Sequence, residues 1–287
     1  MNRWLTRAVV LAIVAVFGIG AGFGTGAGIG TATAAEGDYS RVPKAKLTQK
    51  PFRGITLITV GNRVVCTGFV IAPNKVVTAA HCLVQNASKG KYNFKTGVPK
   101  NVRVYRGYSQ AFGGSAYKSC GVSRAWAHAN FVKSGPNDKN YGSRPHDYAV
   151  LTTKCKFPQN AVLRLWATEH GDGTLTSGKR VRTAGYPADP RVKGMNGLNM
   201  WRTEGRVRPV GVEPRHLHFT GFVASGMSGG PVWRTFPKDS PCGRTHCVVG
   251  IITRCAINSG GQCKLTLRSD RLAVRITPQV KRLLRSK

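Results

Sequence analysis

The sequence predicts an all-β fold of two six-stranded-type antiparallel barrels, followed by one C-terminal helix. Short runs rich in Val, Ile and Thr alternate with glycine- and asparagine-containing turns, a pattern typical of many short antiparallel strands. The same pattern recurs in both halves, and the roughly 250 residues after the expected leader can bury two small cores. Only residues 277–284, with apolar Val280, Leu283 and Leu284, show helical spacing.

The expected strands fall into two groups, separated by a glycine-rich linker at residues 171–177. We therefore place the N-terminal barrel at residues 51–170, and the C-terminal barrel with its helix at residues 171–287. A segment rich in Gly, Pro, Asn and Ser at 135–145 is expected to be an exposed loop. The expected strands are residues 55–60, 63–71, 75–79, 101–105, 122–128 and 148–153, then 180–184, 199–207, 216–222, 231–234, 248–253 and 264–267.

The N-terminus has the features of a secretion signal at residues 1–35. Arg3 and Arg7 precede a short apolar core at residues 8–17, and small residues before Glu36 offer a cleavage site. A membrane anchor is the alternative, but the apolar core is only about ten residues, and about 20 are needed to span a membrane. We expect a secreted protein without a membrane span after cleavage. Residues 36–50, polar and basic, are expected to be a flexible lead or a short propeptide.

The chain is strongly basic. It holds 44 Lys and Arg against 11 Asp and Glu; two of the basic residues fall in the expected signal, which leaves 42 and a net charge of +31. Such a charge favours solubility and anionic partners. The basic residues are spread along the chain without a nucleic-acid motif, which argues against specific nucleic-acid binding. Anionic cell-wall polymers and an acidic protein substrate are candidate partners; a charged surface without a dedicated partner is the alternative.

Residues 226–231, Gly-Met-Ser-Gly-Gly-Pro, put a serine on a tight turn. Glycines on both sides of Ser228 let the backbone approach a substrate closely, and let the N–H groups of Gly226 and Ser228 point at one spot. A serine needs a base to become a nucleophile. The motif therefore predicts a nucleophile at Ser228 and an oxyanion hole formed by Gly226 and Ser228, provided that a base lies nearby.

Two upstream segments supply the base and an acid. His81 ends an apolar, β-branched run, and Asp147 opens another strand-like run. A near-neutral imidazole can take the Ser228 proton and later give it to the leaving amine. Asp147 would hold the second ring nitrogen and stabilise the imidazolium. The order His, Asp, Ser along the chain is that of chymotrypsin-type proteases.

On these motifs the chain resembles the chymotrypsin-like (trypsin-like) serine peptidases and, among them, the bacterial glutamyl-endopeptidase-like branch. The resemblance covers roughly residues 52–284. It implies a double-barrel endopeptidase that works through His81, Asp147, Ser228 and an acyl-enzyme, and we expect a monomer without cofactor or metal. The matching motifs are Thr-Gly-Phe-Val-Ile at 67–71, Thr-Ala-Ala-His-Cys at 78–82, Asp-Tyr-Ala-Val-Leu at 147–151, Ala-Gly-Tyr-Pro at 184–187 and the serine motif.

Eight cysteines follow the expected signal and favour an oxidising destination. The family pattern joins the first two. The next two lie on strands around the Asp147 run and form a reasonable second bridge. The last four allow three pairings, of which short loop closure favours one, and they lack the paired C-x-x-C spacing of a zinc site. The expected bridges are Cys66–Cys82, Cys120–Cys155, Cys242–Cys247 and Cys255–Cys263.

The residues around the serine depart from those of animal trypsins. Met227 replaces the aspartate that would pair with a newly cut N-terminus, so activation by such a cut is not expected. Phe222, six residues before the serine, is not an acid, so cleavage after Lys or Arg is not supported. Ile252 falls where glutamate-specific relatives carry histidine. The predicted pocket, suited to medium apolar residues with acidic residues at adjoining subsites, comprises Phe222, Val223, Ile252, Thr253 and Arg254.

The sequence thus favours a secreted serine endopeptidase. The first alternative is a non-catalytic, protease-like protein that binds a polyanion through its basic surface; the complete set of three site residues argues against it. The second is a serine esterase of the α/β-hydrolase type, because residues 226–230 also fit the G-x-S-x-G pattern. That fold needs its acid and then its histidine after the serine. Only Asp239 and His246 follow, too close to Ser228 for the intervening βα units.

Overall fold

The computed structural model describes most of the chain from Tyr39 onward. The expected signal at 1–35, the expected strand at 264–267 and Cys263 lie outside the described residues. The residues that the structure describes are 39–61, 63–83, 101–115, 117, 119–134, 144–169, 171, 173, 175–208, 215–240, 242–243, 246–255 and 271–287.

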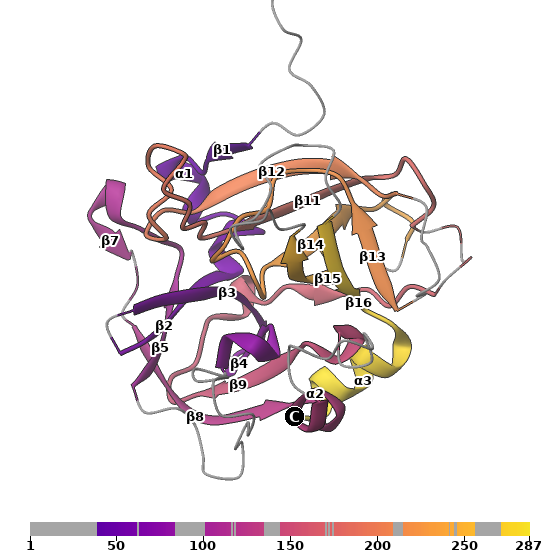
Figure 1. The fold of residues 1–287 in the computed structure, drawn as a ribbon, viewed down its shortest axis with the longest axis horizontal. Coiled ribbons are helices and arrows are strands. Elements are labelled where there is room, and N and C mark those ends of the chain that lie inside the picture. The colour runs from indigo at the N-terminus through magenta and orange to yellow at the C-terminus, as the bar shows by residue number, and fades with distance from the viewer. Residues whose placement is uncertain are drawn as a thin grey trace, which may run out of the picture. The chain divides into compact units, whose positions relative to one another are not determined.

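The first half forms a closed six-stranded antiparallel barrel in the order β2-β3-β4-β9-β8-β5 (Figure 1). Aliphatic side chains from alternate strand positions fill its interior; Ile58, Val76 and Leu151 are fully buried there. This alternation is what a sheet with one face on a core requires. The strands are β2 (Ile55–Val60), β3 (Arg63–Ala72), β4 (Lys75–Thr78), β5 (Val102–Arg106), β8 (Cys120–Ala127) and β9 (Ala149–Thr153).

Strands of the second half, joined by β1 and β10 from before residue 171, form an eight-stranded sheet in the order β1-β12-β11-β14-β15-β16-β13, with β10 paired to β15. A bridge between Val207 and Phe219 joins the end of β12 to β13, so the sheet curls around its own core. The strands are β1 (Tyr39–Arg41), β10 (Arg164–Leu165), β11 (Arg180–Gly185), β12 (Trp201–Arg206), β13 (His216–Phe219), β14 (Pro231–Thr235), β15 (His246–Cys255) and β16 (Arg271–Arg275). A small hairpin of β6 (Tyr108–Ser109) and β7 (Gly114–Ser115) stands apart.

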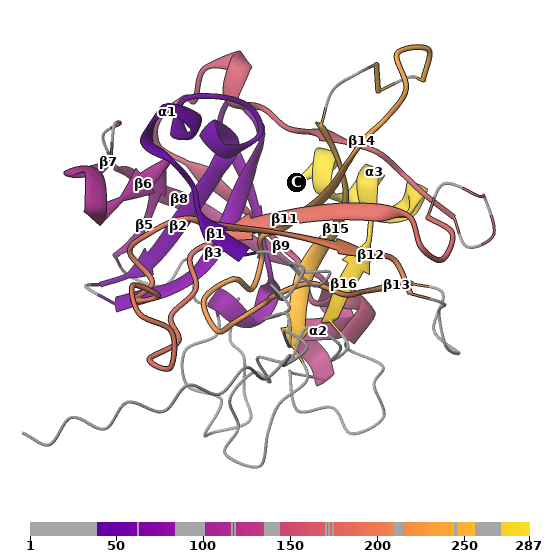
Figure 2. The same ribbon diagram turned by 90° about the horizontal axis from the view of Figure 1, so that it is seen from above.

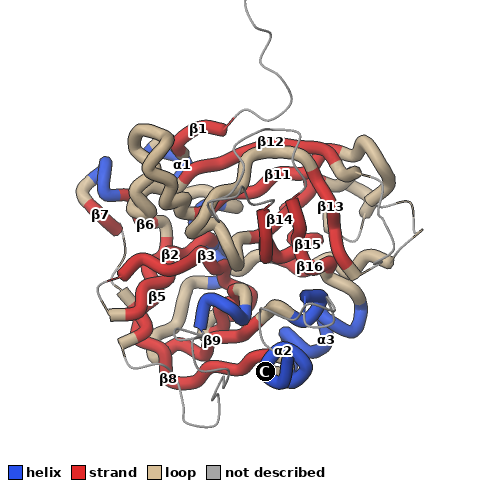
Figure 3. Tube along the Cα trace, viewed as in Figure 1, coloured by secondary structure: helices blue, strands red, loops and turns tan. Residues whose placement is uncertain are grey.

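Helices are few among the described residues, as Figure 3 shows. The C-terminal helix begins where the sequence predicts: the Thr277 hydroxyl accepts a hydrogen bond from the Val280 N–H, and a proline follows the cap. Leu284 anchors the helix in the core. The α-helices are α1 (Lys44–Leu47), α2 (Ala129–Ser134) and α3 (Pro278–Ser286), and the 3₁₀ helices are η1 (Phe52–Gly54), η2 (Ala80–Leu83), η5 (Gln110–Phe112), η6 (Arg144–His146) and η7 (Gln159–Ala161).

The all-β class with two barrel-like halves and a C-terminal helix is confirmed. Residues 39–50, part of the segment expected to be a flexible lead or a short propeptide, form β1 and α1, with β1 paired to β12. Val42 and Leu47 are buried in the core and hold this segment in place. Within the described residues, no helix has both the length and the apolar character that a membrane crossing requires.

Candidate active site

His81 lies on η2, directly after β4 of the first barrel. Two hydrogen bonds tie it to Asp147: the His81 N–H donates to Oδ1 over 2.9 Å, and the ring Nδ1 lies 2.7 Å from Oδ2. The His81 side chain is 29% exposed, whereas that of Asp147 is 6% exposed. With Nδ1–H donating to the carboxylate, the ring presents an unprotonated Nε2, the form that can accept a proton.

Opposing effects set the pKa of His81. Burial of the imidazole lowers it, whereas the negative charge of Asp147 and the hydrogen bond to that carboxylate raise it. The positive charge of Arg254 lowers it further. The contribution of Asp147 prevails, so the pKa of His81 lies above its ordinary value of 6.5.

Asp147 is held between η6 and β9. The Tyr148 N–H donates to the His146 carbonyl over 2.8 Å, which fixes the turn that carries the carboxylate. The His146 ring stacks on His128, with the ring centres 4.1 Å apart, and its Nε2 lies 3.2 Å from Nδ2 of Asn130. The His146 ring is thus engaged with His128 and Asn130, whereas the His81 ring lies against the Asp147 carboxylate.

Ser228 lies on a tight turn before β14. Gly226 and Gly229 have φ angles of +87° and +82°, a region that favours glycine. The N–H groups of Met227, Gly229 and Gly230 donate to backbone carbonyls. Within the described residues, those of Gly226 and Ser228 donate to none. Among the described residues, these two N–H groups are therefore left without a backbone acceptor, as donors to an oxyanion must be.

The serine turn is hydrogen-bonded to the first barrel. The Thr67 N–H donates to the Ser228 carbonyl over 2.9 Å, and the Thr67 hydroxyl donates to the Gly226 carbonyl over 2.8 Å. Cys82 Sγ lies 3.8 Å from the Ser228 carbonyl oxygen. Because Cys82 follows His81, these contacts bring the serine turn to the segment that carries the histidine. In the described residues no hydrogen bond joins the Ser228 hydroxyl to the His81 ring; such contacts are often long without substrate.

Gly229 leaves no room for a side chain. A Cβ there would overlap Thr78 Oγ1 and the Thr67 carbonyl, and would lie 2.6 Å from the Ala79 nitrogen. We expect Gly229→Ala to lower the free energy of unfolding by about 3 kcal/mol, from the left-handed φ and the overlap combined. Activity should fall as well, because the serine turn must move. Urea denaturation and peptide hydrolysis measure both.

Gly113→Ala is the matched control, since Gly113 has a φ of +86° and no contacting atom within 4 Å of the place that a Cβ would take. It carries the backbone strain without the overlap, and should destabilise by about 1–2 kcal/mol with activity retained. Equal losses of stability and activity in the two variants would contradict the packing around Gly229.

The predicted pocket residues lie next to the serine turn or in the core behind it. Ile252 exchanges backbone hydrogen bonds with Gly229 and Gly230, of 2.7 and 2.9 Å. Ile252 is fully buried, and Phe222 and Val223 are at most 2% exposed. The Thr253 hydroxyl donates to the carbonyl of Leu272. Of the five predicted residues only Arg254 is partly exposed, and its charge acts on His81.

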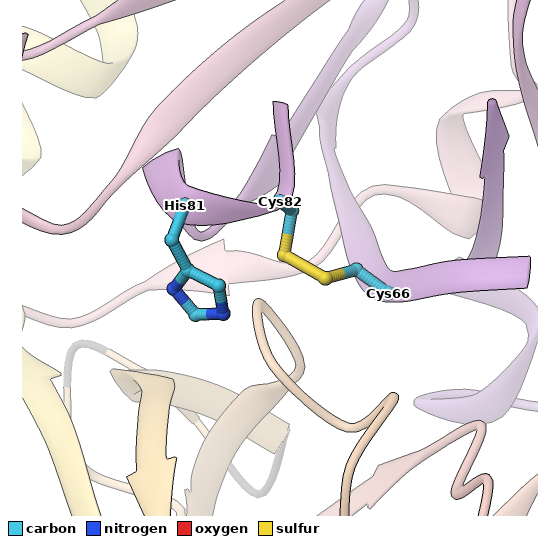
Figure 4. Close-up of side chains that lie close together, drawn as sticks. All are labelled: Cys66, His81 and Cys82. Atoms are coloured by element: carbon cyan, nitrogen blue, oxygen red, sulfur yellow. A yellow bond between two sulfur atoms is a disulfide. The ribbon is translucent and has the colours of Figure 1, made fainter. Parts of the chain in front are cut away.

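Six of the described cysteines form disulfides in the pairs Cys66–Cys82, Cys120–Cys155 and Cys242–Cys247 that the sequence analysis favours. The expected pair Cys255–Cys263 lies outside what the structure describes. Figure 4 shows the first bridge beside the His81 ring; the sulfur and nitrogen atoms of this group lie within 4.8 Å of one another. Bonded sulfurs are not thiolates, the form that binds metals, so the group does not constitute a metal site.

Sequence reasoning missed two supporting residues. The Thr67 hydroxyl also accepts a hydrogen bond from the Tyr186 N–H over 3.0 Å, so one side chain links three segments of the site. Arg271 is fully buried, and its Nε donates to the Gly221 carbonyl over 3.1 Å, next to the predicted pocket. The motif at residues 67–71, which begins with Thr67, was the available signal for Thr67; a buried arginine in a basic chain gives none.

Comparison with known proteins identifies the class. The trypsin-like peptidase domain family matches residues 66–235, more than half of the chain, and the protein therefore belongs to that family. Among solved structures, a Glu endopeptidase in complex with MPD is similar, with a TM-score of 0.62 at 19% identity. The match covers 88% of this chain and 97% of that one, and at this identity it supports the fold. Comparison with curated proteins gives no match.

Proposed function

We propose that the protein is a secreted serine endopeptidase in which His81, Asp147 and Ser228 form the catalytic triad. The observation that carries the proposal is the pair of hydrogen bonds between His81 and Asp147, on a segment that the serine turn contacts. Family membership supports the peptidase class. The all-β fold argues against the α/β-hydrolase esterase alternative, which needs a sheet covered by helices.

The reaction follows from these positions. His81 Nε2 takes the Ser228 proton as the hydroxyl oxygen attacks the scissile carbonyl carbon. The resulting oxyanion accepts hydrogen bonds from the N–H groups of Gly226 and Ser228, and the Asp147 carboxylate stabilises the imidazolium. His81 then protonates the leaving amine, which leaves an acyl-enzyme. Water, deprotonated by His81, attacks the ester and regenerates Ser228.

Export is supported by the three disulfides, which persist in oxidising compartments. The basic surface provides a means of association with anionic cell-wall polymers. Neither inference depends on the residues of the catalytic triad.

We further propose cleavage after medium apolar residues, with acidic residues accepted at adjoining subsites. Phe222, Val223 and Ile252 provide apolar surroundings without a carboxylate, and burying an unpaired ammonium there would be costly. Arg254, partly exposed and close enough to act on His81, provides a positive charge for an acidic side chain. Digestion of a peptide library tests this: dominant cleavage after Lys or Arg would contradict it, and absence of any cleavage would contradict the endopeptidase itself.

Arg254→Gln should move the acid limb of the kcat/KM profile to higher pH. The base must be neutral, so activity falls as the pH drops below the pKa of His81. Removing a positive charge that lowers this pKa lets it rise, and the loss of activity then begins at a higher pH. Arg124→Gln, an exposed arginine on β8, removes the same charge elsewhere and should leave the limb in place. A limb that stays fixed or moves to lower pH in Arg254→Gln would refute the assignment of His81.

A further inference from the structure

A basic groove of about 810 Å³ runs along β11 and β12, walled on one side by the N-terminal segment. It shares no lining residue with the proposed triad or the predicted pocket. Its size is within the range of small-ligand sites. The cationic side chains that line it are Lys46, Lys50, Arg180, Arg182, Arg202 and Arg206, and we call the site they form the basic groove.

Strand alternation creates the charge. On β12, Arg202, Glu204 and Arg206 point to one face, while the residues between them are buried. Pairing with β11 sets Arg180 opposite Arg206 and Arg182 opposite Glu204. Two neighbouring strands thus present their charged side chains on a single face, which the linear sequence does not show.

Positive charge is in excess in the basic groove. Among the described residues, Glu204 is the single acidic residue in its lining; Oε1 lies 2.9 Å from Arg180 Nε, and Oε2 lies 2.6 Å from Arg182 Nε. Within the described lining, six cations against one carboxylate leave five positive charges. The pKa of His246, which also lines the groove, is lowered. Burial is the largest cause, and the positive charges of Arg182 and Lys50 lower the pKa further.

The wall opposite the strands is held in position. β1 pairs with β12 in register from Tyr39 to Arg41, and the two strands lie together in Figure 2. Val42 and Leu47 are buried beneath this segment, which leaves Lys46 and Lys50 exposed at the groove. A site whose walls are fixed before binding loses little conformational entropy when it is occupied.

We propose that the basic groove binds an extended acidic segment of the protein substrate. Outward-facing residues on a strand repeat about every 6.8 Å, and alternate side chains of an extended peptide have the same repeat. Arg202 and Arg206 are two such repeats apart, so carboxylates four residues apart on an extended peptide can meet both in register, and arginine pairs with carboxylates in a two-pronged geometry. Glu204 lies midway between these arginines. It would repel an unbroken row of phosphates, whereas a peptide can place a neutral residue there.

The groove is connected to the site through β11. Arg182 lines the groove, and Gly185 lies three residues further along the strand, a distance of about 10 Å. Gly185 packs against Met227 of the serine turn: a Cβ added to Gly185 would lie 3.3 Å from Met227 Cα. One polypeptide can therefore occupy the groove and reach Ser228. Naming a protein substrate as the source of the acidic segment rests on the proposed function.

The test measures binding separately from catalysis. In the Ser228→Ala background, fluorescence anisotropy follows a labelled peptide with glutamate at every fourth position and neutral residues between, its glutamine counterpart and inorganic polyphosphate. The glutamate peptide should bind more tightly than both. Arg202→Gln with Arg206→Gln should weaken its binding by about tenfold or more, because two charge-assisted contacts are lost.

The matched control is Arg103→Gln with Arg124→Gln, two exposed arginines of the first barrel. It removes the same charge and should leave peptide affinity within about twofold, since exposed charges further apart than a Debye length of about 8 Å are largely screened at 0.15 M salt. Equal weakening in both double variants would show diffuse attraction and overturn the proposal, as would tight binding of polyphosphate without binding of the acidic peptide. The binding test involves no cleavage, so its result can be interpreted even if the proposed peptidase activity is not found.

Discussion

Ser228→Ala should lower kcat for peptide hydrolysis by about 10⁶-fold, the loss seen when the nucleophile of a comparable triad is removed. The hydroxyl supplies the attacking oxygen, and alanine has no atom in its place. Stability should change little, because within the described residues the Ser228 side chain donates no hydrogen bond and its backbone contacts remain. Single-turnover hydrolysis of a chromogenic peptide, with the urea midpoint as the check of folding, measures the effect.

Ser225→Ala provides the control within the same turn. Ser225 is exposed, and its carbonyl, which the substitution keeps, accepts a hydrogen bond from the Ala188 N–H. This variant should retain nearly full activity. If Ser228→Ala kept more than about one hundredth of wild-type kcat, another nucleophile would have to be found, since the oxyanion hole and binding alone leave far less.

Asp147→Asn should reduce kcat by about 10⁴-fold, the loss recorded for this change in a comparable triad. An amide can donate to His81 Nδ1, which would leave the proton on Nε2, where it blocks acceptance of the serine proton. The change also removes the negative charge that raises the pKa of His81. Whatever activity remains should therefore show an acid limb at lower pH than wild type.

Asp239→Asn removes the same charge from an exposed loop and should leave both kcat and the pH profile unchanged. An Asp147→Asn variant with near wild-type kcat would contradict the role of Asp147. Circular dichroism shows whether the Asp147→Asn variant is folded. The loss of kcat supports the role of Asp147 only when it is measured on the folded variant.

The local sequence pattern was enough to locate most strands of both barrels. Runs such as 55–60 and 180–184 match β2 and β11 closely, because β-branched residues and turn glycines encode strands locally. β1 and α1 were missed for a physical reason. Their residues are mostly polar and exposed, and only Val42 and Leu47 reach the core, so their order depends on pairing with β12, more than 150 residues away.

The three segments that carry the proposed triad were chosen from sequence, because each has a local motif around its candidate side chain. What sequence could not supply is the link between them. Thr67 becomes a support of the serine turn only when β3 and that turn meet in space. The basic groove likewise depends on the register of β11 against β12, so its arginines looked scattered along the chain.

The central claim is that Ser228 is a nucleophile activated by His81. Its most direct test is labelling of the native protein with a fluorophosphonate probe, followed by mass spectrometry of the proteolytic peptides. We predict a single phosphonyl adduct on Ser228, formed faster as the pH rises through the pKa of His81 and absent after heat denaturation. An adduct on another residue, or labelling that persists in Ser228→Ala, would contradict the account.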